Sequence, residues 1–186
     1  MIKIGIVIGS TRPGRKAEAV ARWAYDIARK RTDAEFELVD TADFNLPLLD
    51  EPMPAMFGQY SHDHTRAWSA KIASFDGYVF VTPEYNHSTS AALKNAIDFL
   101  YHEWNNKAAG FIAYGGTMGA RAVENLRLVM AELQVATVRA QVGLSLFTDF
   151  ENFTVFKAAE MQQKSVNGML DQVIAWSGAL KPLRNK

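Results

Sequence analysis

The sequence contains no cysteine, so disulfides, thiolate nucleophiles and cysteine-based metal sites are all excluded. It also lacks net charge, because 20 lysines and arginines balance 20 aspartates and glutamates. That balance argues against a general nucleic-acid binder and against a strongly acidic electron carrier. No uncharged apolar run is long enough to span a membrane, and no basic segment precedes a long apolar run at the N-terminus. We therefore expect a cytoplasmic protein that binds neither nucleic acid nor membrane.

What the sequence does contain is one alternating pattern of strands and helices. Apolar residues make up 48% of the chain and charged residues 22%, as in a globular domain, and we predict a single domain over residues 1–186. Short apolar runs predict buried strands at residues 2–8, 36–39, 78–82, 110–114 and 138–146. We predict an α/β fold, a doubly wound sheet of five parallel strands in the order 2-1-3-4-5 with helices on both faces. Strict polar–apolar alternation marks the last strand as an edge strand.

Apolar residues at helical spacing predict the connecting helices. One such stripe runs from Leu93 to Trp104, and the last predicted helix covers about residues 153–177. Residues 42–61 differ from both patterns, because they mix three prolines with leucine, methionine and phenylalanine. This stretch is too rich in proline for a regular element and too apolar for a solvated linker. We expect it to pack against the sheet rim, a bound ligand or a second subunit.

A polar turn follows the third strand. Proline has no N–H for the sheet ladder, so the strand should end near Thr82, and the hydroxyl residues 88–90 can cap the next helix. In an open parallel sheet, ligands lie outside the carboxyl ends of the strands, where this turn is. The turn offers backbone N–H groups, an aromatic ring, an amide and a carboxylate, which suit a flat heterocycle with a hydrogen-bonding edge, such as a flavin. Its candidate residues are Pro83, Glu84, Tyr85, Asn86 and His87.

The loop after the first strand has the properties of a phosphate site. Its glycines let the backbone approach an anion, and the following helix N-terminus adds N–H donors and partial positive charge. The loop is not a P-loop, because it lacks the Lys-Ser/Thr pair that such a loop requires. The alternative is a cation-rich loop with no ligand. The candidate residues are Gly9, Ser10, Thr11, Arg12, Arg15 and Lys16.

The turn after the fourth strand contains Gly115 and Gly116. Residues without side chains let backbone amides reach a ligand, and N–H donors there stabilise negative charge. A plain tight turn is the alternative reading of this pair.

Three segments together resemble the NAD(P)H-dependent FMN reductase family, which includes flavodoxin-like quinone, azo and chromate reductases. The signature-like segment is residues 83–86 followed by residues 91–98, and residues 9–12 and 114–116 match as well. The resemblance covers roughly the first three quarters of the chain, in the right order. It implies a flavodoxin-like fold, FMN as cofactor, and NADPH or NADH as electron donor. It also implies ping-pong transfer to a small-molecule acceptor, such as a quinone, an azo compound, a metal oxyanion or free flavin, and a homodimer or homotetramer.

Arg15 and Ala17 depart from the family pattern, because many relatives carry a hydroxyl residue and an asparagine there. Phosphate binding would then depend more on charge and backbone, or an arginine would face the phosphate of NADPH instead. His62 and His64 lack a third ligand nearby, so we expect a solvated surface and no metal. Two other functions stay open: a flavodoxin-type electron carrier without a nicotinamide site, and a nucleotide-binding α/β protein without flavin.

Overall fold

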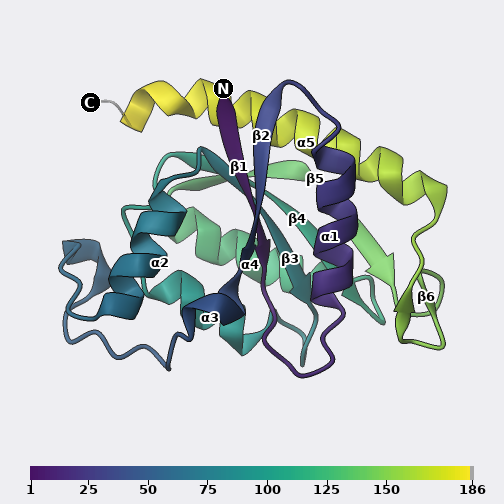
Figure 1. Ribbon diagram of the computed structural model, residues 1–186, viewed down its shortest axis with the longest axis horizontal. Helices are drawn as coiled ribbons and strands as arrows, with labels where there is room; N and C mark the ends of the chain where they lie inside the picture. Colours follow the sequence, from purple (N-terminus) through teal and green to yellow (C-terminus); the bar gives the residue numbers. More distant parts are fainter. Residues whose placement is uncertain (185–186) are drawn as a thin grey trace.

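Five apolar segments pair side by side as parallel strands in the order β2-β1-β3-β4-β5, as predicted (Figure 1). This computed structural model describes residues 1–184. Every residue of β3 and β4 is buried, which explains why both strands are apolar along most of their length, with Thr82 and Lys107 as buried polar exceptions. The strands are β1 (Ile2–Ile8), β2 (Ala34–Asp40), β3 (Gly77–Pro83), β4 (Lys107–Gly115) and β5 (Val135–Ser145).

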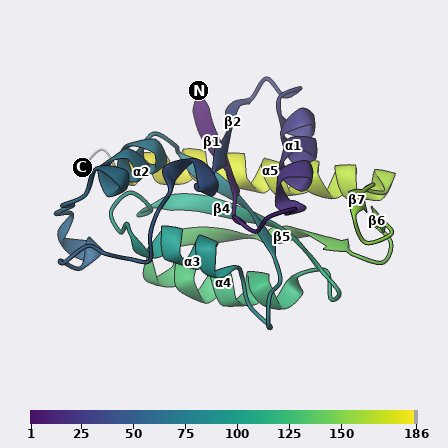
Figure 2. The same cartoon turned by 60° about the horizontal axis from the view of Figure 1, so that its bottom comes forward.

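Helices cover both faces of the sheet, with a separate apolar core under each set. Helices α1 (Ala17–Ala28) and α5 (Glu160–Leu180) pack on one face. Helices α2 (Asp63–Ala73), α3 (Ala91–Asp98) and α4 (Ala120–Glu132) pack on the other. Figure 2 shows α1 and α5 above the sheet and α3 and α4 below it. The alternating strand β5 lies at one edge, as predicted.

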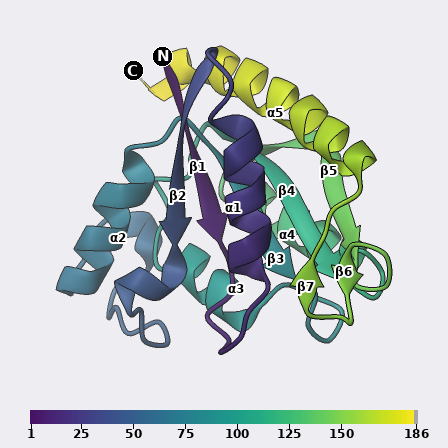
Figure 3. The same ribbon diagram turned by 45° about the vertical axis from the view of Figure 1, so that its right-hand side comes forward.

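Two predicted helix boundaries are wrong. Helix α3 ends at Asp98, and Trp104 lies beyond it, fully buried, with its indole N–H donating to the carbonyl of Ile97 at 3.2 Å. The last helix begins at Glu160 and not near residue 153. An antiparallel hairpin precedes it, formed by β6 (Phe150–Glu151) and β7 (Val155–Phe156), and it lies beside the lower end of α1 (Figure 3). Its Phe156 ring packs edge-on against Trp23 of α1 with centroids 5.2 Å apart.

The proline-rich stretch contains only two short 3-10 helices, η1 (Thr41–Phe44) and η2 (Ala55–Phe57). Part of it packs inward, because the ring of Phe44 contacts that of Trp68 with centroids 4.8 Å apart. Its middle is exposed, and Leu48 is 84% accessible. A further 3-10 helix, η3 (Lys181–Arg184), follows α5. Within residues 1–184, no helix combines the length and the apolar character that crossing a bilayer requires.

Candidate functional site

The loop after β1 begins with a glycine that has no room for a side chain. A Cβ on Gly9 would lie 2.7 Å from Cδ2 of Leu93 and 2.9 Å from the carbonyl oxygen of Val81. The Gly9 N–H donates to that same carbonyl at 2.8 Å, and the Ser90 hydroxyl donates to the Gly9 carbonyl. Ser90 also caps α3 by accepting from the Leu93 N–H at 3.1 Å. The start of the loop is therefore fixed against β3 and α3.

The end of the loop leads into a helix whose first N–H groups have no side-chain cap. Gly14 has φ 68°, in the left-handed region that glycine adopts without strain. Lys16 occupies the cap position of α1 and makes no side-chain capping hydrogen bond. Unpaired N–H groups and the helix dipole together favour an anion at this position.

The three cations of the loop differ in what they contact. Arg15 donates from Nη1 to Oδ1 of Asp40 at 2.8 Å and to the carbonyl of Ser10 at 2.6 Å, and its Nη2 pairs with the second carboxylate oxygen. The hydrogen bond with Asp40 raises the pKa of Arg15. Arg15 therefore holds the loop to the end of β2. Arg12 and Lys16 form no ion pair within residues 1–184 and supply the available positive charge.

The turn after β3 is a tight two-residue turn. Tyr85 and Ser88 exchange backbone hydrogen bonds of 2.9 and 3.0 Å. Between them, Asn86 and His87 have φ values of 47° and 72°. Positive φ at both central residues is the type I′ pattern, and asparagine tolerates this region better than most residues. Within the described chain, no group hydrogen-bonds the Asn86 side-chain amide, which leaves it free to pair with a ligand.

Tyr85 connects the first loop with this turn. Its hydroxyl lies 3.5 Å from Oγ of Ser10, and the Arg12 guanidinium lies 6.0 Å from its ring centroid. Parts of the three predicted segments border one cavity of about 150 Å³, whereas the predicted residues Gly9, Ser10, Asn86, His87 and Gly116 do not line it. The lining residues are Arg12, Pro13, Gly14, Arg15, Lys16, Pro83, Glu84, Tyr85, Tyr114, Gly115 and Leu146. Thr11 instead borders a separate cavity of about 450 Å³ beside η1 and α3.

The turn after β4 packs closely against the turn after β3. The Glu84 N–H donates to the Tyr114 carbonyl at 3.0 Å, and a Cβ on Gly115 would lie 3.2 Å from Cβ of Glu84. Gly116 is more open, since the nearest atom to a Cβ built there is on Phe147 at 3.9 Å. Backbone N–H groups at this turn can therefore reach a ligand in the cavity.

Glu84 lines the cavity, but its carboxylate is held by residues of the next turn and of α4. It accepts hydrogen bonds from the Thr117 hydroxyl at 3.1 Å and from Nε of Arg121 at 2.6 Å. Burial by itself would raise the pKa of Glu84, but the hydrogen bonds from Arg121 and Thr117 outweigh it and lower that pKa. The sequence placed Glu84 among the ligand-binding residues, whereas the structure uses its carboxylate to join two turns.

Comparison with known proteins shows which family the chain belongs to. The family model described as NADPH-dependent FMN reductase matches residues 2–149, a range that contains all three loops. The chain belongs to this family. It is 42% identical over 159 residues to the NAD(P)H-dependent FMN reductase ntnL of Nectria sp., an alignment that covers 80% of this chain and 79% of that protein.

A second relative extends the match along nearly the whole of this FMN reductase. An NAD(P)H-dependent FMN reductase of Schizosaccharomyces pombe is 35% identical over 184 residues, covering 98% of this chain and 85% of that protein. Among solved structures, the flavoenzyme FerB from Paracoccus denitrificans superposes with a TM-score of 0.74 at 19% identity, covering 96% and 98% of the two chains. Family membership establishes an oxidoreductase that uses NAD(P)H and FMN, and the neighbour shares the flavodoxin-like fold.

The residues of this FMN reductase fit its cofactor once one side chain moves. Uncapped N–H groups, two available cations and an unpaired amide suit a phosphate and a hydrogen-bonding ring edge. The cavity of about 150 Å³ is smaller than the roughly 300–1,000 Å³ of most ligand sites. Tyr85 lines this cavity with its hydroxyl 3.5 Å from Oγ of Ser10, so a ligand of flavin size would require its ring to turn aside.

Sequence reasoning missed some residues of the site. Tyr114 borders the cavity from the end of β4, and burial raises the pKa of its hydroxyl. Tyr114 could have been found from its position at the carboxyl end of a predicted strand, directly before two glycines. Leu146 and Arg121 carried no such signal, because neither residue type is unusual at its place in the sequence.

The two histidines set aside as surface residues lie away from the cavity. His62 and His64 stack with ring centroids 5.1 Å apart, and Nε2 of His64 lies 3.0 Å from Oδ1 of Asp50. Within residues 1–184, no three His, Cys, Asp or Glu side chains are grouped to hold a metal ion.

Proposed function

We propose that this chain is an NAD(P)H:acceptor oxidoreductase whose FMN site is the cavity between the loops after β1, β3 and β4. The observation that carries the proposal is the convergence of these loops on one cavity, with Arg12 and Lys16 available for an anion and Asn86 available for a ring edge. Crevices outside the carboxyl ends of parallel strands are where such folds bind ligands.

In this proposal each loop binds a different part of FMN. The phosphate lies at the N-terminus of α1, the ring lies against the turn after β3, and its pyrimidine edge meets the turn after β4. Arg15 fixes the loop after β1, and Glu84 binds Arg121 of α4. In this proposal neither side chain contacts FMN directly. The residues proposed to contact the cofactor are Gly9, Ser10, Arg12, Lys16, Pro83, Tyr85, Asn86, His87, Gly115 and Gly116, and Thr11 is left out because it borders the separate cavity.

In this proposal, the protein itself binds FMN and orients it. When bound, FMN accepts a hydride from NAD(P)H and passes reducing equivalents to an acceptor. No side chain is required as an acid or base in this proposal. The backbone N–H groups near Gly116 stabilise negative charge at the ring edge. Donor and acceptor use the same space beside Tyr85 in turn, which is a ping-pong order.

The rim of the cavity favours a flat organic acceptor. Phe147 is 69% exposed and packs edge-on against Phe153 with ring centroids 5.6 Å apart. Phe147 also lies next to the open Gly116. An exposed aromatic pair beside the ring edge suits a quinone or an azo compound better than a metal oxyanion, because a charged oxyanion gains nothing from apolar contact.

We also propose a homo-oligomer. The stretch 47–57 exposes several large apolar side chains, which would be unusual on a free surface. Trp104 gives no support, because it is buried within its own chain. Light scattering at micromolar concentration should give at least twice the chain mass of 20.7 kDa, and a monomer would remove this part of the proposal. The exposed residues are Leu48, Leu49, Met53, Met56 and Phe57.

The function is tested by mixing the FMN-loaded protein anaerobically with NADPH or NADH and following the flavin absorbance. Bleaching within seconds, followed by reoxidation on addition of a quinone, is the expected result. A flavodoxin-type carrier would bind FMN but bleach slowly or not at all with either nucleotide. A protein that binds no FMN at micromolar concentration would contradict the proposal outright.

A further inference from the structure

Helix α4 carries two polar side chains, Arg121 and Asn125, that contact the turn after β3. They are four residues apart, so they lie one turn apart on the same face of the helix. Arg121 binds the carboxylate of Glu84 through its side chain and through its backbone N–H at 3.3 Å. Asn125 donates from Nδ2 to the carbonyl of His87 at 3.1 Å. The helix therefore holds the turn after β3 at Glu84, just before the Tyr85–Ser88 pair, and at His87, one of its two central residues.

The contact with Glu84 has the features of a strong ion pair. The Glu84 side chain is only 5% exposed, while the Arg121 side chain is 46% exposed. A buried carboxylate is tolerated only when it is paired and its lone pairs are satisfied. Here the Thr117 hydroxyl and three N–H groups of Arg121 satisfy them. Arg121 is thus what keeps a charged Glu84 acceptable at this buried position.

The contact with His87 acts on a strained piece of backbone. Both Asn86 and His87 have positive φ, a conformation that is unfavourable for most side chains other than glycine and asparagine. Such a conformation persists only when its surroundings determine it. The hydrogen bond from Asn125, together with the two backbone bonds between Tyr85 and Ser88, provides that determination.

The same helix also anchors the third loop. Gly119 precedes α4 with φ 68°, and a Cβ there would lie 2.5 Å from Cβ of Ala113 and 2.8 Å from the Tyr114 nitrogen. The turn after β4 therefore cannot shift without moving the start of α4. Helix α4 is fixed to the turn after β4 and hydrogen-bonds Glu84 and His87 of the turn after β3. It therefore sets the distance between these two turns.

We propose that Arg121 and Asn125 are positioning residues, which fix the flavin-binding turn after β3 relative to the turn after β4 without touching the cofactor. This inference rests on the proposed function. Arg121 has a second effect, since it neutralises the buried Glu84 carboxylate beside the ring. Without Arg121, the carboxylate would oppose the negative charge that reduced FMN carries.

The test compares Arg121→Ala, Arg121→Lys, Glu84→Gln and Asn125→Ala with the wild-type protein. Arg22→Ala is the control, because Arg22 is an arginine with a 65% exposed side chain that pairs with Glu18 on α1 and does not line the cavity. Three quantities are measured: the Kd for FMN by fluorescence titration, the midpoint potential of bound FMN against a reference dye, and urea unfolding of the apoprotein.

We expect Arg121→Ala to raise the Kd at least tenfold and to lower the midpoint potential. Arg121→Lys should recover part of both losses, because it restores the charge. Asn125→Ala should raise the Kd severalfold and leave the potential unchanged, and Glu84→Gln should make a second Arg121→Ala change nearly silent. Arg22→Ala should change neither quantity.

Unchanged Kd and potential in both α4 variants would overturn the inference, as would losses that appear equally in Arg22→Ala. A potential that stays constant in Arg121→Ala while Kd rises in proportion to lost apoprotein stability would also overturn it, since that is a merely structural effect. If the wild-type protein itself binds no FMN, the proposed function fails first. The Arg121→Lys variant keeps the test valid if Arg121→Ala does not fold.

Discussion

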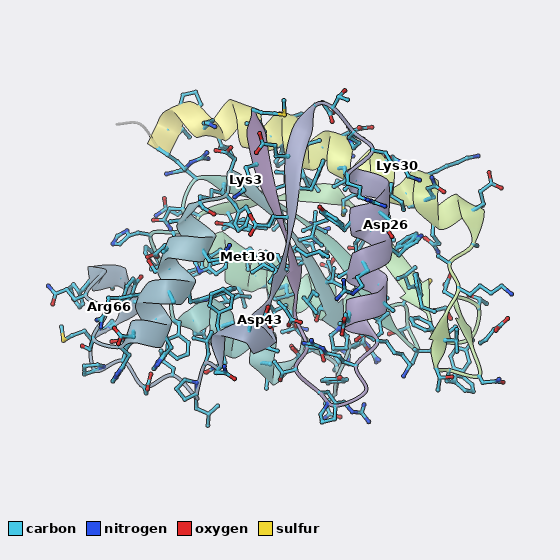
Figure 4. All side chains as sticks on the ribbon, in the orientation of Figure 1. Lys3, Asp26, Lys30, Asp43, Arg66 and Met130 are labelled. Carbon is cyan, nitrogen blue, oxygen red and sulfur yellow. The ribbon has the colours of Figure 1, made fainter. Side chains whose placement is uncertain are left out.

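The two ends of the sheet use polar residues in opposite ways. At the carboxyl ends of β1, β3 and β4, cations and an amide stay available, and Asn86 and His87 have positive φ. At the amino ends, charges are buried and satisfied within the chain. Figure 4 labels one residue near each end, Lys3 near the start of β1 and Asp43 in η1, beyond the end of β2.

The amino end is centred on Asp76 and Lys107. The Asp76 carboxylate accepts from the Lys3 N–H and from Lys181, each at 3.0 Å, and pairs with Arg184. Lys107 is 3% exposed and donates to the carbonyl of Ile72 at 3.1 Å. Within residues 1–184, the charges of Asp76 and Lys107 are thus paired or hydrogen-bonded inside the chain. The comparison indicates that polar residues at one end stabilise the fold, while those at the other end serve recognition.

The largest expected effect on the free energy of unfolding comes from adding a side chain to a glycine at the carboxyl end of the sheet. Gly119 and Gly14 share φ 68°, but a Cβ on Gly119 meets atoms at 2.5 Å, whereas a Cβ on Gly14 meets nothing within 4 Å. Gly119→Ala should therefore lose about 3 kcal/mol or more of unfolding free energy, from steric overlap added to left-handed strain. Gly14→Ala, its matched control, should lose about 1 kcal/mol. Urea unfolding of both apoproteins measures the difference, and equal losses would contradict the packing argument.

The next largest effect is expected on FMN binding alone, without a change in the free energy of unfolding. Arg12→Ala should weaken FMN binding by roughly 1.5–3 kcal/mol, the value of one charge-assisted hydrogen bond, and leave unfolding unchanged. Lys94→Ala is the control, because Lys94 pairs with Asp98 on the surface of α3. Fluorescence titration of the apoproteins measures both. Equal FMN affinity in wild type and Arg12→Ala would show that Arg12 does not bind the phosphate.

At the amino end, the prediction concerns pH. Burial and the nearby Arg184 lower the pKa of Lys107 to about 7, although Asp76 and Glu103 oppose the shift. In the unfolded chain a lysine titrates near pH 10.4. Between these two values the unfolded state binds a proton that the folded state does not, so the free energy of unfolding should rise with pH. The slope from this group should reach at most about 1.4 kcal/mol per pH unit.

Lys107→Met should flatten that slope without changing FMN affinity. Urea unfolding at pH 7, 8 and 9 measures it, with the wild-type protein alongside. A variant that keeps the wild-type slope would mean that another group causes it. A variant that loses FMN affinity would mean that the two ends of the sheet are coupled.

The smallest expected effect is at Asn86. Leucine at φ 47° would strain the turn as well as remove the amide, so Asn86→Gly is the cleaner change. It should reduce FMN affinity by about 1 kcal/mol and leave the turn folded. Stopped-flow reduction by NADPH, measured on Asn86→Gly and on Tyr85→Ala, separates contact with the ring edge from the shaping of the acceptor space. Tyr85→Ala should alter acceptor preference more than the rate of flavin reduction by NADPH. Wild-type affinity in Asn86→Gly would exclude the amide as a ring contact.

The alternation of strands and helices, together with the chain length, predicted the sheet order, and local patterns predicted the positions of the three loops. Continuous apolar runs followed by glycine or proline fix where a buried strand ends, and that signal lies within a few residues of sequence. The hairpin 150–156 was not predicted, because Asn152 and Phe153 adopt positive φ values of 48° and 57°, which helical spacing alone does not reveal. The buried Trp104 likewise continued a helical stripe that the chain in fact leaves at Asp98.

The roles of individual site residues depend on partners that are distant in sequence. Arg15 looked like a phosphate ligand, but Asp40, 25 residues away, binds its guanidinium. Glu84 looked like a ring ligand, but Arg121, 37 residues away, binds its carboxylate. Neither partner stands out in the sequence, since charged residues on an amphipathic helix or after a strand are common. Such pairings become visible only when the elements are placed in space.

Hydrogen exchange with and without FMN tests most directly that the carboxyl end is the cofactor site and the amino end is not. Mass spectrometry of the peptides gives both ends in one experiment. The account predicts that saturating FMN slows exchange in residues 9–16, 83–88 and 115–119. It predicts no change in residues 74–78, 104–108 and 181–184. Protection at the amino end, or none in the three loops, would contradict it.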